Sequence, residues 1–213
     1  MVVVYVHGLW LPGHEGFLLR RRVGRALGAE TRSFSYASVG CGLDENALAL
    51  KRYLRTIQAD TVHLVAHSLG GLVVLKLFEP GVVAGGDLGF APGRIVFLGS
   101  PVRGSWSAQR FARLPFGRRL LGLTAADTLL VSRERRWAGA RDLGVIAGDM
   151  PVGVGRLLGP MGAPNDGTVL VEETDLPGAT QQLRMRVNHS GMPFSALVAR
   201  QTAGFLREGR FEG

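Results

Sequence analysis

Short runs of consecutive apolar residues alternate along the chain with longer segments in which apolar residues recur every three or four positions. Continuous apolar runs rich in valine are typical of strands buried on both faces of a parallel sheet. Two further segments alternate polar and apolar residues, which indicates half-exposed strands. The continuous runs are residues 2–6, 62–66, 94–98 and 143–147, and the alternating ones are 31–36 and 183–187.

Helical spacing covers about 15–27 and 44–57, a segment that begins after Ser68, and about 194–206. Asp44 is predicted to cap the second of these helices. Because strands alternate with helices, we expect an α/β fold, with an open, doubly wound sheet of six mostly parallel strands and helices on both faces. The two alternating segments are expected at the edges of the sheet, where one face of a strand meets water.

The composition indicates one domain. The 213 residues are 46% hydrophobic, which suffices for one sizeable core over residues 1–213. The single cysteine, Cys41, cannot form an intramolecular disulfide and is interpreted as structural, which fits a reducing compartment. Residues 2–6 are too short an apolar run for a signal peptide, and no run is long enough to span a bilayer, so we expect a cytoplasmic protein.

The net charge of +8 is concentrated in one segment. Residues 101–141 contain nine arginines, with Asp127 and Glu134 as the only acids, and tryptophan, phenylalanine and leucine are interleaved among them. The pattern predicts short amphipathic helices in a connection longer than most. One interpretation is a packed helix with a solvated arginine face. The other is a cationic cap that admits acyl chains and attracts anionic lipid or phosphorylated substrates. The tandem aromatic and basic pattern of nucleic-acid modules is absent from the sequence, so no nucleic-acid partner is expected.

Ser68 lies between a predicted strand and a predicted helix, in the pattern Ala-x-Ser-x-Gly that spans residues 66–70. This pattern differs by one residue from the G-x-S-x-G nucleophile elbow, a sharp strand-to-helix turn. Small residues at both ends of the pattern suit such a turn, because it crowds the neighbours of the nucleophile. The helix that follows points its first N–H groups toward the position where negative charge would develop.

Other motifs lie in loops, several of them directly after predicted strands, at the edge where parallel sheets carry their chemistry. Together with the elbow they resemble the α/β-hydrolase superfamily, specifically small bacterial lipases and carboxylesterases, over nearly the whole chain. The resemblance implies the α/β-hydrolase fold in a minimal six-stranded form, with residues 101–141 as a short cap or lid. Ala66 departs from the glycine that most members have at that position. The motifs are His7-Gly8-Leu9-Trp10, the elbow at 66–71, Gly99-Ser100-Pro101-Val102-Arg103-Gly104-Ser105, Asn165-Asp166-Gly167-Thr168-Val169 and Asn188-His189.

The resemblance implies a catalytic triad in the chain order serine, acid, histidine. His189 is the one histidine downstream of Ser68 in the sequence and is the predicted base. Two candidates remain for the acid. Asp166 lies 23 residues before His189 in a motif that resembles the acid of larger bacterial lipases, and we favour it, although Asp-Gly is also a strong turn signal. Asp149 follows the predicted strand at 143–147, where the fold most often places its acid.

The same resemblance assigns the remaining site residues. The backbone N–H groups of Leu9 and Leu69 are expected to form the oxyanion hole. Trp10 is expected either to line the acyl pocket or to contact the core or the lid. No cofactor and no metal are expected, since the upstream histidines lack ligand spacing with carboxylates or cysteine.

These residues predict an ester hydrolase of the esterase or lipase type, whose partner is a small acyl ester or a lipid. A thioesterase or an acyltransferase would use the same three side chains, and acyl-CoA would suit the arginine-rich segment. A third possibility is a binding module that kept the fold without catalysis. The presence of serine, acid and histidine argues against that third possibility.

Overall fold

A single parallel sheet organises the protein. The computed structural model describes residues 1–79 and 89–212, and within them six strands pair in the order β2-β1-β3-β4-β5-β6, every pair parallel. The two alternating segments form the edges, as predicted, and the four apolar runs lie between them. The strands are β1 (Val2–Val6), β2 (Glu30–Phe34), β3 (Val62–His67), β4 (Pro92–Leu98), β5 (Leu143–Gly148) and β6 (Gln181–Met185).

Both edge strands end earlier than the alternation of side chains predicts. β2 pairs with β1 only as far as Phe34, and the Tyr36 N–H donates instead to the side chain of His7, in the loop after β1. β6 ends at Met185, because the Val187 N–H turns back to the Met185 carbonyl (2.8 Å) instead of joining β5. The end of a ladder is set by its hydrogen bonds, which the side-chain pattern does not show.

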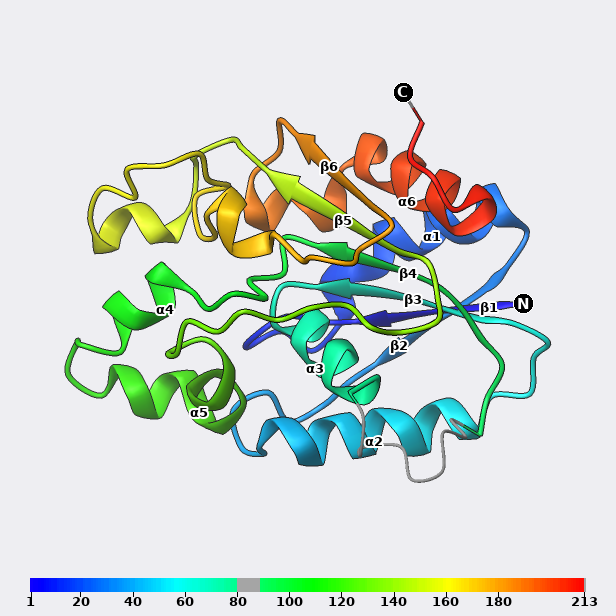
Figure 1. Ribbon diagram of the computed structural model, residues 1–213, viewed down its shortest axis with the longest axis horizontal. Helices are drawn as coiled ribbons and strands as arrows, with labels where there is room; N and C mark the ends of the chain where they lie inside the picture. Colours follow the sequence, from blue (N-terminus) through cyan, green and yellow to red (C-terminus); the bar gives the residue numbers. More distant parts are fainter. Residues whose placement is uncertain (80–88, 213) are drawn as a thin grey trace.

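Helices cover both faces of the sheet, as predicted. α1 and α6 lie on one face, and α2 and α3 lie on the other (Figure 1). Successive side chains of a strand point to opposite faces, so Val4 belongs to the core under α2 and α3, while Tyr5 belongs to the core under α1 and α6. These helices are α1 (Phe17–Leu27), α2 (Leu43–Arg55), α3 (Leu69–Leu77) and α6 (Ala196–Glu208).

The first turns of two helices differ from the predicted ones. The N-cap of α2 is Gly42, whose N–H donates to the Glu45 carboxylate (2.9 Å). The predicted cap, Asp44, lies instead in the first turn, where its charge is close to the positive end of the helix dipole. α6 begins two residues later than predicted, because Ser195 Oγ caps it by accepting the Val198 N–H (3.2 Å).

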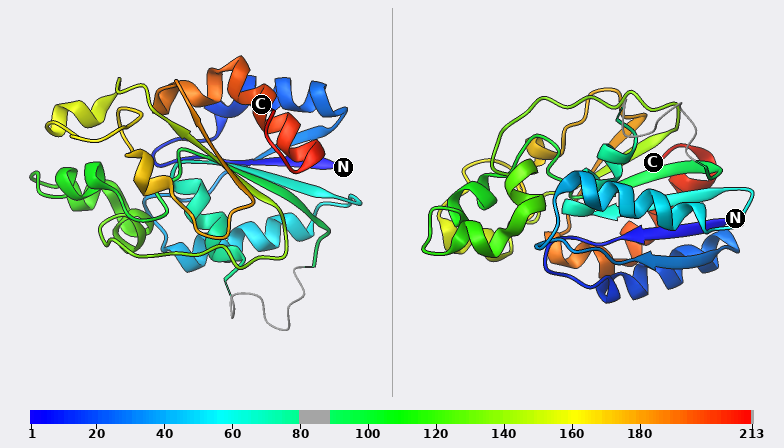
Figure 2. Two further views of the ribbon diagram at one scale, coloured as in Figure 1. Left: turned by 45° about the horizontal axis from the view of Figure 1, so that its top comes forward. Right: turned by 90° about the horizontal axis from the view of Figure 1, so that it is seen from below.

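The arginine-rich segment, residues 101–141, forms two short helices as predicted, and we call it the cap. Its helices lie beyond the carboxyl ends of the strands, on the same end of the molecule as the 3-10 helix η3 (Figures 1 and 2). Their buried side chains pack against the first turn of α3 in a third small core, made of Leu69, Leu72, Ala108, Leu121, Ala125 and Leu129. The cap helices are α4 (Trp106–Phe111) and α5 (Gly117–Thr128), and the 3-10 helices are η1 (His14–Gly16), η3 (Val154–Leu158), η4 (Val171–Thr174) and η5 (His189–Phe194).

Transmembrane helices are missing from the part of the chain that the structure describes. Within it, no helix combines the length and the apolar character that crossing a bilayer requires. Residues 153–164 contain η3 and are otherwise irregular.

Candidate active site

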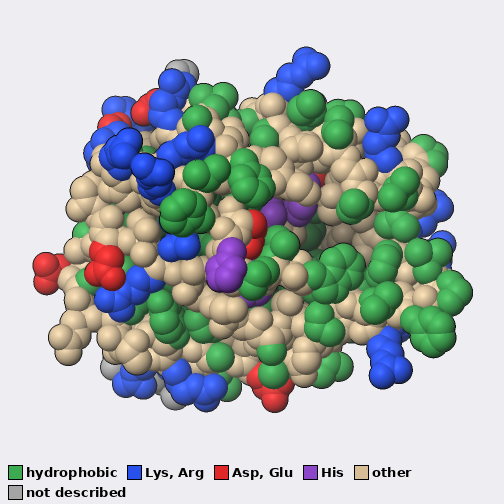
Figure 3. Space-filling view, turned by 180° about the vertical axis from the view of Figure 1, so that it is seen from behind, with side chains coloured by type: hydrophobic (Ala, Val, Ile, Leu, Met, Phe, Trp, Pro, Cys, Tyr) green, Lys and Arg blue, Asp and Glu red, His purple; other side chains and the backbone are tan. Residues whose placement is uncertain are grey.

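Ser68 occupies a sharp turn between β3 and α3. Its φ of 53° and ψ of −123° lie in a region that non-glycine residues rarely adopt, at a cost of about 1–3 kcal/mol. The turn is held because the Ser68 N–H donates to the Leu98 carbonyl (2.9 Å). A Cβ on Gly70 would lie 2.5 Å from the backbone oxygens of Val6 and His7, so only glycine fits there. The side chain of Ser68 is partly exposed, and the surface is hollowed where histidine side chains reach it (Figure 3).

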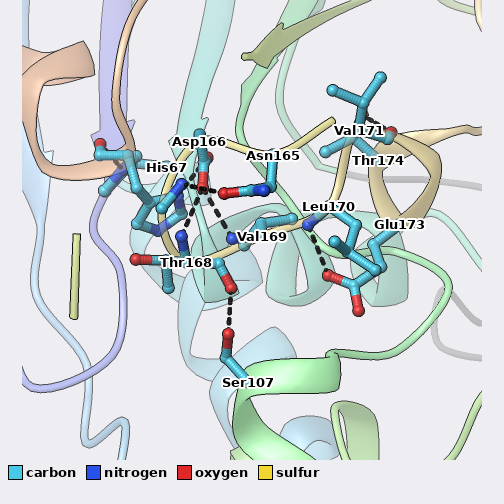
Figure 4. A network of polar contacts seen from close by, with 12 residues as sticks. His67, Ser107, Asn165, Asp166, Thr168, Val169, Leu170, Val171, Glu173 and Thr174 are labelled. Atoms are coloured by element: carbon cyan, nitrogen blue, oxygen red, sulfur yellow. Dashed lines mark hydrogen bonds and ion pairs between the residues drawn. The ribbon is translucent and has the colours of Figure 1, made fainter. Parts of the chain in front are cut away.

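His189 and Asp166 form a buried hydrogen-bonded pair. The His189 Nδ1–H donates to Asp166 Oδ2 at 2.7 Å, and the two residues are 7% and 1% exposed. The other carboxylate oxygen, Oδ1, accepts the N–H groups of Thr168 (3.0 Å) and Val169 (2.7 Å), so the carboxylate is fixed in direction (Figure 4). With the proton on Nδ1, the Nε2 of His189 is left as an unprotonated base.

Gly99, directly after β4, lies beside the pair of Asp166 and His189. A Cβ on Gly99 would lie 3.1 Å from both Asp166 Oδ2 and His189 Nδ1. The preceding residue, Leu98, accepts the N–H of Ser68, so the elbow borders the same strand end. Within the described residues Ser68 Oγ makes no hydrogen bond to His189. Such contacts are often long before a substrate is bound.

Asp149, the alternative acid, lies elsewhere. It follows β5 and pairs with Arg184 Nε on the neighbouring edge strand (2.7 Å). It has no hydrogen bond to a histidine among the described residues. The structure therefore brings Asp166, and not Asp149, into contact with His189.

The two predicted oxyanion donors belong to segments at the elbow: Leu69 follows Ser68, and a Cβ on Gly8, the residue before Leu9, would lie 3.2 Å from Ser68 Cβ. The Leu69 N–H is the first of α3, and the Leu9 N–H follows β1; in the described part of the chain neither donates to another protein group. His7 orients the Leu9 N–H. The Nε2 of His7 accepts the Tyr36 N–H (3.1 Å), so the imidazole proton is on Nδ1. This Nδ1–H donates to the Gly8 carbonyl (2.7 Å), which belongs to the same peptide group as the Leu9 N–H.

Tyr36 supports this arrangement, a role that its sequence context did not indicate. Its ring stacks on that of His7 with centroids 4.3 Å apart, and its hydroxyl donates to the His7 carbonyl (3.0 Å). Burial lowers the pKa of His7, which favours the neutral imidazole that this hydrogen-bond pattern needs.

Trp10 connects the loop after β1 to the cap. Its indole Nε1–H donates to the Leu120 carbonyl of α5 (2.8 Å), and its ring packs edge-on against Phe111 of α4 with centroids 5.7 Å apart. It has a left-handed φ of 62° and is 54% exposed. The structure therefore shows one of the two expected roles, the contact with the cap. The other role, in lining the acyl pocket, stays a prediction.

The loop that carries Asp166 is also tied to the cap. Ser107 Oγ–H, at the start of α4, donates to the Thr168 carbonyl (2.5 Å) (Figure 4). The Glu173 carboxylate accepts the N–H groups of Trp106 and, at 2.9 Å, Leu170. Burial raises the pKa of Glu173 to about 7. No pattern in the sequence indicated this role for Glu173.

His67 anchors the loop of the candidate base. Its Nε2–H donates to the His189 carbonyl (3.2 Å), and the two rings lie 4.8 Å apart. Burial, reinforced by the neighbouring His189, lowers the pKa of His67 to about 3. The ring therefore stays neutral in the folded protein across the ordinary pH range.

The depressed pKa of His67 predicts how stability depends on pH. The unfolded chain binds a proton at His67 near pH 6.5 and the folded protein only near pH 3, so stability from this group is lost as the pH falls between those values. The loss approaches about 1.4 kcal/mol per pH unit. The amide of His67→Gln keeps a donor to the His189 carbonyl. In this variant the free energy of unfolding, measured in urea, is expected to fall on acidification with a slope that is shallower by this amount. An unchanged decline would contradict the assigned burial.

The described residues contain no group of three or more His, Cys, Asp or Glu side chains placed to hold a metal ion. Cys41 is a free, partly buried thiol in the loop before α2, away from the elbow in sequence. The candidate chemistry thus rests on Ser68, His189 and Asp166.

Comparison with known proteins places the chain in a family. Residues 3–204 match the model of the alpha/beta hydrolase family. No curated protein matches the sequence. Among solved structures, the mature lipase BlEst2 of Bacillus licheniformis is similar, with a TM-score of 0.68 and 18% identity over 88% of this chain and 84% of that one. The metagenomic carboxyl esterase MGS0156 has a TM-score of 0.65 and 21% identity, over 90% of this chain and 65% of its own.

A third similar structure is the lin2722 gene product of Listeria innocua, with a TM-score of 0.63 and 15% identity over 100% of this chain and 95% of that one. At these identities the structures share the fold. The family model covers nearly the whole chain, and the six-stranded parallel sheet is consistent with the fold of that family. The protein therefore belongs to the α/β-hydrolase family.

Proposed function

We propose that the protein is a serine hydrolase that cleaves carboxylic esters, of the esterase or lipase type. The observation that carries the proposal is the buried hydrogen bond between His189 and Asp166, set at the same strand end as the elbow of Ser68. A buried acid, a base that it orients and a serine on a strained turn are the parts of a triad. Two of the similar structures are a lipase and a carboxyl esterase, which supports the same class.

In the proposed reaction, Ser68 Oγ attacks the acyl carbonyl carbon while His189 Nε2 takes the hydroxyl proton. Asp166 holds the imidazole with its other proton on Nδ1 and stabilises the imidazolium. The proton then passes to the leaving alkoxide, which departs as the alcohol and leaves an acyl-Ser68 ester. A water molecule, deprotonated by His189, attacks this ester, releases the carboxylic acid and restores Ser68.

The oxyanion of each tetrahedral intermediate is assigned to the N–H groups of Leu9 and Leu69. One such donor contributes about 3 kcal/mol to transition-state stabilisation in related sites. The hydrogen bond from His7 to the Gly8 carbonyl keeps the Leu9 N–H in a fixed direction, so the donor needs little reorganisation during the reaction. The N-terminus of α3 adds a favourable dipole.

The test is turnover of p-nitrophenyl esters of increasing acyl chain length, measured beside an acyl-CoA series. We expect steady ester hydrolysis that is absent from Ser68→Ala. Faster turnover of acyl-CoA than of any oxygen ester would favour the thioesterase alternative on the same residues. No turnover of either series above the Ser68→Ala background would contradict the proposal and favour a binding module.

A further inference from the structure

Large apolar side chains are exposed on two segments at the end of the molecule that carries the candidate active site. One is the cap tip, residues 114–123, and the other is the η3 tip, residues 152–157. Leu157 is 87% exposed, Phe116 77% and Val154 64%. Leu114, Leu120, Leu123 and Val152 are each about half exposed as well, with exposed fractions of 48%, 54%, 55% and 48%.

The two tips belong to one rim. Both extend beyond the carboxyl ends of the strands in every view (Figures 1 and 2), and Figure 3 shows hydrophobic side chains gathered over that end, on the right. A Cβ on Gly159, next to the η3 tip, would lie 3.9 Å from Trp106 of α4. The Gly155 N–H of the η3 tip donates to the Gly167 carbonyl (2.8 Å), beside Asp166. The cap tip is held from the other side by the Trp10–Leu120 hydrogen bond.

The backbone of the cap tip directs Phe116 outward. Phe116 has a φ of 61°, which is rare for a bulky residue, and it precedes Gly117, where a Cβ would lie 2.0 Å from the Phe111 carbonyl oxygen. This strained turn holds an aromatic ring in water, although burying the ring would be favourable. A large apolar side chain that is held in water in this way is available to insert into an apolar phase.

The charge around the tips has a single sign. Residues 106–126 and 150–164 contain no aspartate or glutamate. Their arginines are all exposed, and none forms an ion pair with a carboxylate within residues 1–79 and 89–212. These arginines are Arg110, Arg113, Arg118, Arg119 and Arg156.

We propose that the two tips insert into an anionic phospholipid bilayer and bring the mouth of the active site against its surface. Exposed apolar side chains in the same segments as arginines without a carboxylate partner among the described residues suit binding in the plane of a lipid interface, where the apolar groups enter the acyl region and the cations meet phosphate. A second copy of this chain fits less well, because a two-fold contact would bring the unpaired arginines of both copies together. The inference builds on the proposed function, since it names the surface from which that site takes its acyl ester.

The test is co-sedimentation of the whole protein with vesicles of phosphatidylcholine alone or mixed with phosphatidylglycerol. We expect binding to the anionic vesicles that weakens between about 0.1 M and about 1 M salt, as the screening length falls from about 10 Å to about 3 Å. Arg118→Gln/Arg119→Gln should lower the partition coefficient about 25-fold, at about fivefold for each charge. Phe116→Ser/Leu157→Ser should lower it by at least about tenfold.

Control variants carry substitutions of the same kinds on helices away from the rim. Arg21→Gln/Arg25→Gln on α1 and Leu48→Ser on α2 change exposed residues and should bind as the wild type does. Thermal unfolding of each variant checks that it is folded. Equal binding to both lipids, no binding to either, or tip variants that bind as the controls do would each overturn the inference. So would a dimer in sedimentation velocity, without lipid, that the tip variants abolish.

Hydrolysis of a soluble short-chain ester by the wild type separates this inference from the proposed function. Turnover of the soluble ester without vesicle binding overturns the docking surface and leaves the hydrolase standing. Vesicle binding without any ester turnover overturns the hydrolase and leaves the docking surface standing.

Discussion

Ester hydrolysis is expected to fall about a million-fold in kcat when Ser68 is replaced by alanine. Nucleophile, base and acid act as a unit, so removing the nucleophile costs nearly all that the triad supplies. The fold should persist, because the Ser68 N–H that anchors the turn to the Leu98 carbonyl is unchanged. Purified Ser68→Ala is compared with the wild type on the best p-nitrophenyl ester, and circular dichroism is recorded for both.

Ser100→Ala is the matched control for this variant. Ser100 follows β4 in the Gly-Ser-Pro motif that begins at residue 99, and its fully buried hydroxyl has no hydrogen-bond partner in the described residues. Its removal should change kcat by less than about threefold, since no polar group loses a partner. Residual activity of more than a few per cent in Ser68→Ala, or loss of activity in Ser100→Ala alone, would contradict the assignment of the nucleophile.

Replacing Asp166 by asparagine is expected to lower kcat about ten-thousand-fold with little change in KM. The carboxylate accepts the His189 Nδ1–H through Oδ2, while two backbone N–H groups hold Oδ1. In Asp166→Asn the amide oxygen takes the place of Oδ1, and the NH₂ group faces His189. The imidazole then carries its proton on Nε2, which is the wrong tautomer for a base.

Asp149→Asn is the control for the acid. Asp149 is paired with Arg184 at the sheet edge, where the two side chains are 23% and 53% exposed, and a solvent-screened pair of this kind contributes about 1 kcal/mol or less to stability. Turnover should therefore stay close to that of the wild type. Steady-state kinetics on both variants test the assignment of the acid. A near-normal kcat for Asp166→Asn together with an inactive Asp149→Asn would exchange the two assignments.

The fold was largely predictable because its signals are local. Runs such as 62–66 are apolar at every position, and a strand with that pattern must be buried on both faces. A strand that alternates polar and apolar residues exposes one face to water, so the two alternating segments were expected at the edges of the sheet. The ends of elements were less predictable. Asp44 is a good cap residue by type, but Gly42 takes that position because the Glu45 carboxylate satisfies its N–H.

The candidate site was predictable where one motif contains its residues, as at the strand-to-helix turn of Ser68. The choice between Asp166 and Asp149 needed three dimensions, because both lie in the connection between β5 and β6 and only the path of that connection brings Asp166 to His189. Hydrogen bonds between buried polar groups that are far apart in the sequence produce no periodic pattern along it. For this reason the roles of Tyr36 and Glu173 emerged only from the structure.

Covalent labelling tests the central claim, that Ser68 is an activated nucleophile, most directly. A fluorophosphonate reacts with a serine that an adjacent base deprotonates and leaves ordinary hydroxyls untouched. Intact mass spectrometry should show one adduct per chain, peptide mapping should place it on Ser68, and Ser68→Ala should stay unlabelled. Stoichiometric labelling of another residue, or a wild type that stays unmodified under conditions that label a known serine esterase, would contradict the account.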